Sequence, residues 1–225
     1  MRIFLTALLL SSSLFAAEEE KTNRRLDDAA VVLSEIMAAP DKGIPNGLLE
    51  KAHCIVIVPG LKKGAFIVGA KYGKGFVSCR ENGGGGWSAP GSVRIEGGSV
   101  GFQIGGSETD VVMLVMNDRG AEKLLSSQFT LGGEGEVAAG PVGRTATAET
   151  DAKMSAEILS WSRAHGVFAG LALQGATLRQ DLDDNEVLYH KRIENRDIVK
   201  GKAAPTPSGR RLTSLLTKYS ARERS

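Results

Sequence analysis

The fold is indicated most clearly by residues 53–80, which read HCIVIVPGLKKGAFIVGAKYGKGFVSCR. Residues 53–59 form a compact run rich in Ile and Val, which is typical of a buried strand. Residues 65–72 and 75–80 also have strand character, and Gly73 and Lys74 between them predict a tight hairpin turn. This stretch therefore predicts several short strands that are separated by glycine turns.

The flanking sequence continues the strand pattern and adds helices. Strands are expected at residues 92–104 (interrupted at Gly97-Gly98), 109–116, 156–162 and 167–174, with closely packed narrow strands within 136–150. Helices are expected at 21–39, 47–52, 181–189 and from an Asn117 or Asp118 cap through Leu125. The fold class is therefore α+β: a mostly antiparallel curved sheet or barrel-like sandwich, with an N-terminal helix and short peripheral helices.

Composition supports one domain of ordinary size. Of the 225 residues, 42% are hydrophobic and 24% are charged, which suffices for a core and argues against disorder. The 28 glycines have no period, so a collagen-like repeat is excluded and many tight turns are expected.

The N-terminus has the features of a signal peptide over residues 1–17. Arg2 gives a positive start, residues 3–10 are nearly all apolar, and Ala16 or Ala17 offers a cleavage position. The apolar run is shorter than the ~20 residues that a membrane-spanning helix needs. We therefore expect an exported protein, periplasmic or secreted and peripherally associated with a membrane. No later segment is long and apolar enough to span a bilayer.

Charge divides the remaining chain into a domain at 18–190 and a basic tail at 191–225. The tail has ten Lys or Arg against three Asp or Glu, a net charge of +7, whereas residues 18–190 carry −6. Residues 201–209 are expected to be a linker, and 208–224 an amphipathic helix. Its apolar face either lies on an anionic membrane or a partner, or packs against the domain. The sequence supports both interpretations equally.

Motifs that carry catalysis are weak. Residues 97–101 (GGSVG) fit the G-x-S-x-G pattern around Ser99, but strand alternation follows where a hydrolase needs a helix. Residues 133–138 (GEGEVA) resemble a dinucleotide loop, but they lack the helix and would repel a pyrophosphate. His53, His165 and His190 are isolated, with no metal-ligand spacing. We therefore expect no enzyme activity, no cofactor and no metal.

Two further features bear on partners. Aromatic residues make up 5% of the chain and the domain is acidic, so specific nucleic acid binding is not expected. Cys54 and Cys79 are the only cysteines. They either pair as a disulfide, if their strands adjoin, or remain two buried thiols.

Short blocks over residues 52–189 resemble the SYLF domain family, found in bacterial exported proteins and eukaryotic membrane-trafficking proteins. The blocks are VIVP at 56–59, KGAFIVG at 63–69, YGKG at 72–75, GWSAP at 86–90, GFQIG at 101–105, AAGPVGR at 138–144, WSR at 161–163, GVFAG at 166–170, and Asn185 with Tyr189. This chain departs from the family at residues 133–135 (GEG). The basic tail is expected to lie outside the shared domain.

The resemblance implies a phospholipid-binding module, with phosphoinositide binding in eukaryotic members and actin binding in fungal ones. In some eukaryotic members an amphipathic helix at the N-terminus of the domain is implicated in membrane contact. Residues 21–39 correspond to it here, although Asp27, Asp28 and Glu35 weaken that role. We expect an anionic lipid or membrane surface as ligand. Actin binding is not expected of an exported bacterial protein.

Candidate lipid-binding residues follow from charge and position. Arg144, in the turn at 140–144, either holds a phosphate or pairs with Glu149 or Asp151. Trp87 either anchors at a membrane interface or caps the core. The full set is Arg144, Lys63, Lys71, Lys74, Trp87, Arg24, Arg25, Arg210, Arg211 and Lys218. Two alternative functions are a structural or protein-interaction module of the cell envelope, and a serine hydrolase that uses Ser99.

Overall fold

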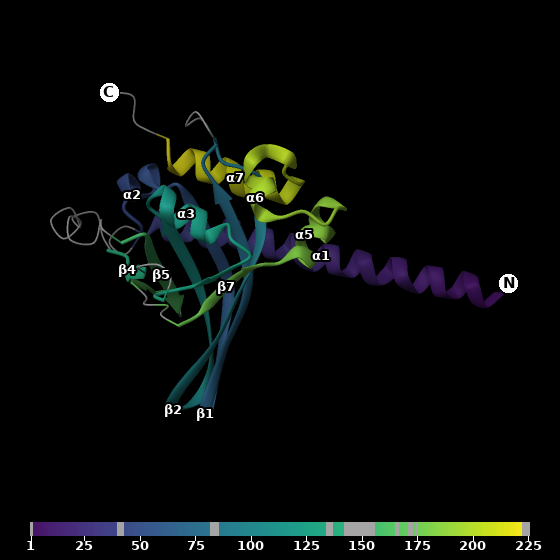
Figure 1. Cartoon of the computed structure of the whole chain (residues 1–225), viewed down its shortest axis with the longest axis horizontal. Coiled ribbons are helices and arrows are strands. Elements are labelled where there is room, and N and C mark those ends of the chain that lie inside the picture. The colour runs from purple at the N-terminus through teal and green to yellow at the C-terminus, as the bar shows by residue number, and fades with distance from the viewer. Residues whose placement is uncertain are drawn as a thin grey trace.

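The structure, a computed structural model, describes residues 2–39, 43–81, 86–133, 137–141, 156–164, 167–170, 173 and 175–221. It confirms the α+β class, with a curled sheet, a long N-terminal helix and several short helices (Figure 1). The helices are α1 (Arg2–Ala38), α2 (Asn46–Lys51), α3 (Asp118–Leu124), α5 (Leu182–Tyr189), α6 (Asn195–Asp197), the π-helix η1 (Ile198–Lys202) and α7 (Pro207–Tyr219). The strands are β1 (Cys54–Cys79), β2 (Gly91–Val115), β3 (Gln128–Thr130), β4 (Val137–Ala139), β5 (Ile158–Ala164), β6 (Val167–Gly170) and β7 (Thr177–Gln180).

Strands β1 and β2 form one long antiparallel ribbon. Cys54 pairs with Val115 at one end and Val77 with Gly91 at the other, and register shifts occur near Pro59 and between Ala65 and Ile67. The predicted hairpin at Gly73-Lys74 is therefore wrong, because both residues lie inside β1. The expected break at Gly97-Gly98 is also wrong, since β2 is continuous through those glycines.

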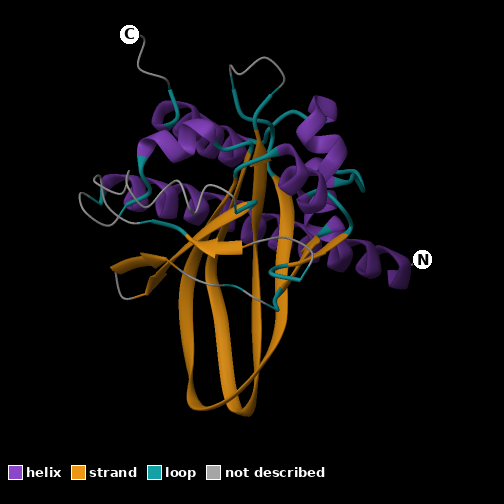
Figure 2. Cartoon of the chain, turned by 60° about the vertical axis from the view of Figure 1, so that its left-hand side comes forward, coloured by secondary structure: helices purple, strands orange, loops and turns teal. Residues whose placement is uncertain are grey.

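The ribbon doubles back on itself, so that its two halves pack together. Figure 2 shows the long strands running away from the helices and turning at their far end. A Cβ on Gly75 would lie only 2.1 Å from the carbonyl oxygen of Ile57, so glycine is needed where the halves meet. Cys54 and Cys79, at the two ends of β1, are joined by a disulfide.

The shorter strands extend the ribbon on both sides. The described sheet has seven strands in the order β3-β7-β2-β5-β4, with β1 on β2 and β6 on β5. All pairs are antiparallel except β4 with β5. β3 and β7 were not expected from the sequence. The expected strands at 156–162 and 167–174 correspond to β5 and β6, although residues 171, 172 and 174 lie outside the described part.

Helix α1 lies across the folded ribbon and α7 lies along α1 (Figures 1 and 2). Leu26, Leu33 and Ile36 of α1 share one core with Leu212 and Leu216 of α7. A second core fills the other face of the ribbon, around Val58, Met113 and Phe129. The apolar face of the tail helix is therefore covered by the domain, which selects the packing interpretation over membrane insertion.

The N-terminal region forms part of α1. This helix begins at Arg2, and its first turns extend beyond the sheet and the other helices (Figure 1). Within the described ranges, no helix combines the length and the apolar character needed to cross a membrane.

Candidate functional site

A groove of about 630 Å³ opens where α1 meets the edge of the ribbon. Its lining comes from α1, β1, β2 and β5, so segments distant in sequence build it together. The lining residues are Lys21, Arg24, Arg25, Asp28, Val31, Val32, Pro59, Gly60, Lys62, Glu108, Asp110 and Arg163. Five of these are basic and three are acidic, which makes the groove polar and charged on both sides.

The cations that α1 contributes to the groove differ in how firmly acidic partners hold them. Lys21 contacts Glu18 at 3.1 Å and Arg24 contacts Glu20 at 2.5 Å, both as exposed pairs within one helix. Such pairs contribute only a few tenths of a kcal/mol, about 0.3–0.5, and exchange easily with a ligand. Arg25 instead pairs at 2.5 Å with Asp184, whose side chain is buried, and is therefore fixed.

The ribbon wall carries a crowded group of carboxylates. Asp110 accepts hydrogen bonds from the backbone N–H of Gly60 at 2.9 Å and from Nε of Arg163 at 2.7 Å. Arg163 also pairs with Glu35 of α1. Burial raises the pKa of Asp110, and the charges of Glu108 and Asp28 raise it further, against the opposing hydrogen bond from Gly60. Two more carboxylates therefore lie close to Asp110.

A second charged surface covers the C-terminal segment. Every Lys and Arg from Lys191 to Lys218 is exposed, whereas the apolar residues Ile193, Ile198, Leu212 and Leu216 are buried. Three of these cations have acidic partners: Arg192 pairs with Asp183 and Glu186, Lys202 with Asp197, and Arg211 with Asp27 of α1. We call residues 191–218 the basic face. It carries eight cations and two acidic residues.

The predicted tail residues lie on this basic face. Arg210 donates to the carbonyl oxygen of Pro205 at 3.0 Å, and Arg211 pairs with Asp27 at 3.1 Å. The ammonium group of Lys218 lies 5.3 Å from the ring centre of Tyr219. The segment expected to be a linker is partly helical, because η1 reaches Lys202 and α7 begins at Pro207. α7 ends at Tyr219 rather than at residue 224, and residues 222–225 lie outside the described part.

Lys74 is paired with two carboxylates of the fold and is not a free surface cation. Its ammonium group lies 3.0 Å from Asp181 and 2.8 Å from Asp184, and both carboxylates are almost fully buried. Burial alone would lower the pKa of Lys74, but the hydrogen bonds with these two aspartates raise it. Together with Arg25, Lys74 ties the ribbon and α1 to α5, so neither residue is available as a free lipid contact.

Lys63 and Lys71 lie on opposite halves of the folded β1. Burial lowers the pKa of Lys63, and the positive charge of Lys71 lowers it further. Both side chains are partly exposed. They form a small cationic position on the ribbon, separate from the groove and from the basic face.

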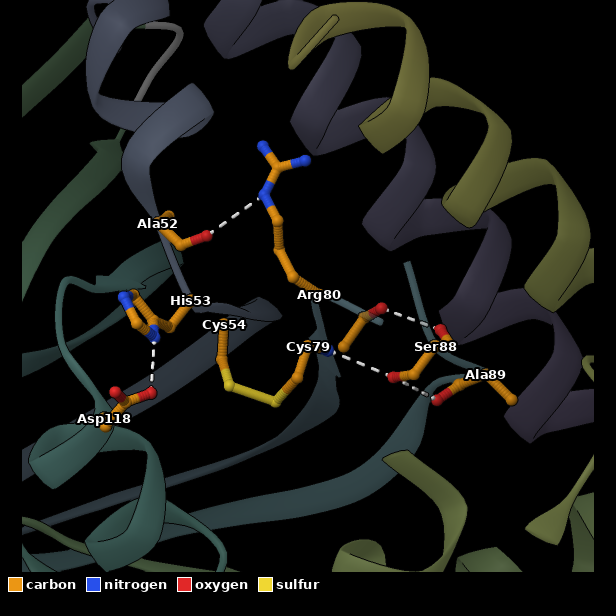
Figure 3. The surroundings of a disulfide bond; sticks show 9 residues. Ala52, His53, Cys54, Cys79, Arg80, Ser88, Ala89 and Asp118 are labelled. Carbon is orange, nitrogen blue, oxygen red and sulfur yellow. Dashed lines mark hydrogen bonds and ion pairs between the residues drawn. A yellow bond between two sulfur atoms is a disulfide. The ribbon is translucent and has the colours of Figure 1, made fainter. Parts of the chain in front are cut away.

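Trp87 is not an exposed membrane anchor. It is 5% exposed and its indole N–H donates to the hydroxyl of Ser220 at 2.9 Å, which attaches α7 to the ribbon. The guanidinium of Arg80 lies 4.7 Å from its ring centre and donates to carbonyls at the end of α2, including Ala52 (Figure 3). The core-cap interpretation of Trp87 is therefore the one that the structure supports.

The turn that was expected to approach a ligand serves packing where it is described. A Cβ on Gly140 would lie 2.1 Å from the ring of Trp161, and the indole N–H of Trp161 donates to the carbonyl of Pro141 at 2.9 Å. The contact with Trp161 therefore requires glycine at position 140. Arg144, with Glu149 and Asp151, lies outside the described residues.

The disulfide joins the two ends of β1, at the end of the ribbon that lies near the helices. Cys54 and Cys79 are both buried, and the hydroxyl of Ser88 accepts a hydrogen bond from the backbone N–H of Cys79 at 3.0 Å (Figure 3). His53 beside it pairs with Asp118 of α3 at 2.9 Å. This region joins β1, β2, α2 and α3 and has the character of a structural junction.

The two motifs that resemble catalytic ones lack, where they are described, the local structure that their chemistry needs. Ser99 lies inside β2, paired with Gly69, so the sharp turn between a strand and a helix that a nucleophilic serine needs is missing. Val137 and Ala138, which end the GEGEVA motif, lie in β4 and not in a helix. In the same described ranges no group of three His, Cys, Asp or Glu could hold a metal ion.

Sequence reasoning identified the tail cations, Arg24 and Arg25, but it missed most of the groove. Lys62, Asp28, Glu108, Asp110 and Arg163 meet only because the ribbon folds and α1 crosses it. No local motif marks them, apart from Arg163 in the WSR block. The partners of Lys74 were missed for the same reason.

Comparison with known proteins places this fold in a family. Residues 96–219 match the family described as Las17-binding protein actin regulator (Ysc84). The match reaches α7, so the expectation that the tail lies outside the shared domain is wrong. This agrees with the packing of α7 against α1 in one core.

Curated relatives support the assignment. SH3 domain-containing YSC84-like protein 1 of Homo sapiens is 35% identical over 170 residues, covering 75% of this chain and 49% of the relative. Its Rattus norvegicus counterpart is 33% identical over 181 residues, covering 80% and 53%. LAS seventeen-binding protein 3 of Saccharomyces cerevisiae is 31% identical over 172 residues, covering 75% and 37%. The chain thus spans about half or less of these relatives, and it belongs to the SYLF (Ysc84) domain family.

Proposed function

We propose that this protein is a non-catalytic binding module that attaches to an anionic phospholipid surface through its basic face. The observation that carries the proposal is the exposure of all eight cations from Lys191 to Lys218 on a segment whose apolar residues Ile193, Ile198, Leu212 and Leu216 are buried. A surface of this kind is attracted to anionic lipids and does not need to insert into the bilayer. A phosphoinositide-like head group, with its additional phosphate, would be held by more charge-assisted hydrogen bonds.

The cellular location of this binding is part of the same proposal. Residues 1–17 have the features of an export signal, so the surface would be a membrane of the cell envelope, with the protein periplasmic or secreted. The names of the relatives refer to Las17 and to SH3 domains, which supports an interaction module with a protein partner as the alternative. A complex that survives in detergent and does not require lipid would favour that alternative.

Vesicle co-sedimentation tests the lipid proposal. We compare phosphatidylcholine vesicles with vesicles that contain equal parts of phosphatidylcholine and phosphatidylglycerol. Each Lys or Arg near an anionic surface contributes about 1 kcal/mol, so Lys200→Gln with Lys218→Gln should lower partitioning roughly 30-fold. Both side chains are exposed and neither forms an ion pair with a described residue, so the double variant should fold normally.

A matched variant removes the same charge elsewhere. Lys63→Gln with Lys71→Gln takes two cations from the ribbon and should leave partitioning nearly unchanged. Equal sedimentation of the wild-type protein with both vesicle types at low salt would refute the proposal. Loss in the ribbon variant, with no loss in the tail variant, would refute the assignment to the basic face.

A further inference from the structure

The groove between α1 and the ribbon differs in chemistry from the basic face. The basic face presents cations to solvent, whereas the groove is lined by cations and carboxylates together, and both α1 and the sheet contribute residues of each sign. A purely anionic ligand would be attracted by Lys21, Arg24 and Lys62 but repelled by Asp28 and Glu108. The groove therefore suits a ligand that carries both signs of charge.

The carboxylates that line the groove have unused capacity for a cation. Both carboxylate oxygens of Asp110 already have partners, in Gly60 and Arg163. Asp28 and Glu108 have no ion pair or hydrogen bond to any described side chain, although both act on the pKa of Asp110. Glu108 lies against the backbone of Gly60, where a Cβ would come within 2.5 Å of its oxygen. An entering cation would relieve the repulsion among these three acids.

Three of the cations that line the groove have unused capacity for a phosphate. Lys62 is exposed and has no ion pair in the described part of the chain, even though it faces Glu108 across the strand pair. Lys21 and Arg24 have only exposed partners on their own helix, which a phosphate displaces at little cost. Arg24 adds the forked donor geometry that matches phosphate oxygens.

An apolar position completes the groove. Val31 of α1 is 40% exposed and is one of only three large hydrophobic side chains exposed among those described. Pro59 of β1 lines the same groove. An apolar contact next to paired charges is what the glycerol and the first chain carbons of a phospholipid would use.

We propose that this groove takes a phosphate ester that also bears a primary ammonium group, the phosphoethanolamine head group of a membrane lipid. Asp28 and Glu108 receive the ammonium, whose three N–H donors fit carboxylates, while Lys62, Lys21 and Arg24 hold the phosphate. A quaternary choline group lacks those donors and binds less well. The inference rests on the proposed function only in taking a membrane lipid as the ligand, because the residues are different.

Vesicles with a fixed share of phosphatidylglycerol test the head group. Replacing the phosphatidylcholine in them by phosphatidylethanolamine should strengthen wild-type binding roughly tenfold, the effect of one charge-assisted hydrogen bond. Asp28→Asn with Glu108→Gln should abolish this gain and leave the phosphatidylglycerol dependence unchanged or higher, because negative charge is removed. Glu81→Gln with Glu122→Gln, two exposed acids outside the groove, should keep the full gain. Circular dichroism checks that each variant is folded.

Calorimetric titration in solution separates the possible sources of the head group. Short-chain phosphatidylethanolamine should bind more tightly than free phosphoethanolamine, and phosphocholine and inorganic phosphate more weakly than either. Equal affinity for the first two would assign the groove to a soluble phosphoethanolamine and refute the lipid.

The two proposals fail in different ways. A phosphatidylglycerol dependence without any phosphatidylethanolamine gain would overturn the groove inference alone. Binding of phosphoethanolamine without any phosphatidylglycerol dependence would overturn the basic face alone. An equal phosphatidylethanolamine gain in the wild-type protein and in the Asp28→Asn, Glu108→Gln variant would show that the groove does not bind the head group.

Discussion

Replacing Lys74 by Met should destabilise the protein strongly without changing lipid binding by the folded molecule. Lys74 contacts Asp181 at 3.0 Å and Asp184 at 2.8 Å, and these carboxylates are only 1% and 4% exposed. Methionine keeps most of the side-chain volume and removes the charge. Asp184 then retains Arg25, but Asp181 has no cation among its described neighbours.

The size of the loss follows from this geometry. Removing one partner of a buried ion pair costs about 3–5 kcal/mol, because the remaining charge stays buried and unmatched. Lys74 is 23% exposed, so water reaches the pair in part, and we expect a value near the lower end, roughly 3 kcal/mol. Asp181 also accepts a hydrogen bond from the backbone N–H of Asp184 and caps α5, so it cannot simply turn away.

Urea unfolding followed by circular dichroism measures the loss. Adding Asp181→Asn to Lys74→Met should recover at least half of it, since asparagine still caps the helix and carries no charge. A loss below about 1 kcal/mol, or no recovery in the double variant, would show that the pair is solvated and refute the reasoning.

The pH dependence gives an independent check of the same pair. The pKa of Lys74 is raised above its ordinary value of 10.5, so its contribution is complete below that pH. It is lost as the pH rises through the higher pKa of the folded state. The alkaline fall in stability should therefore be smaller in Lys74→Met than in the wild-type protein.

Three further changes test the junctions of the fold. Gly75→Ala should lower the free energy of unfolding, measured in urea, by about 3 kcal/mol or more, because its Cβ would meet the backbone of the facing half-strand. Gly64→Ala, with open space around it, should be neutral or slightly stabilising. Cys54→Ala with Cys79→Ala should lower the stability of the oxidised protein by roughly 3.5 kcal/mol, the loop-closure value for a separation of 25 residues. Trp87→Phe should cost about 1–3 kcal/mol by leaving a buried hydroxyl of α7 without its donor, and proteolysis should then release the tail first.

Local sequence signals predicted the short helices α2, α3 and α5 well, but not the start of α1 at Arg2 or the helices α6 and η1. The Asn117 side chain caps α3, as expected, by accepting from the N–H of Gly120 at 2.8 Å. Asp181 caps α5 in the same manner, and α2 begins one residue before its expected start. These features depend on residues within one turn of each other, so the sequence nearby contains the whole cause.

The ribbon could not be predicted in the same way, because its shape depends on distant contacts. Gly73 and Lys74 look like a hairpin turn, yet the chain continues through them as a strand. Glycine is required at position 75 because the backbone of Ile57, which lies far away in sequence, approaches it closely. A glycine that permits a turn and a glycine that permits close packing look identical in sequence.

The sequence indicates which cations are exposed where the helical pattern determines exposure. It does not indicate which cations are paired with residues distant in sequence. The exposed cations of α7 follow from its amphipathic pattern. Lys74 and Arg25 look like free cations until the buried aspartates of α5 are placed beside them. The same holds for Trp87, whose partner Ser220 lies at the other end of the chain.

The packing of α7 decides how this protein would meet a membrane. An amphipathic helix that inserts must expose its apolar face, but Leu212 and Leu216 are at most 2% exposed here, and Arg211 ties the helix to Asp27 of α1. The cations are thus held on a folded surface and cannot be driven into the bilayer without unfolding α7 from the core. Attachment through such a surface is electrostatic and decays over about 8 Å at physiological salt. It is therefore reversible, and any preference among lipids has to come from a site with defined contacts, which the groove under α1 provides.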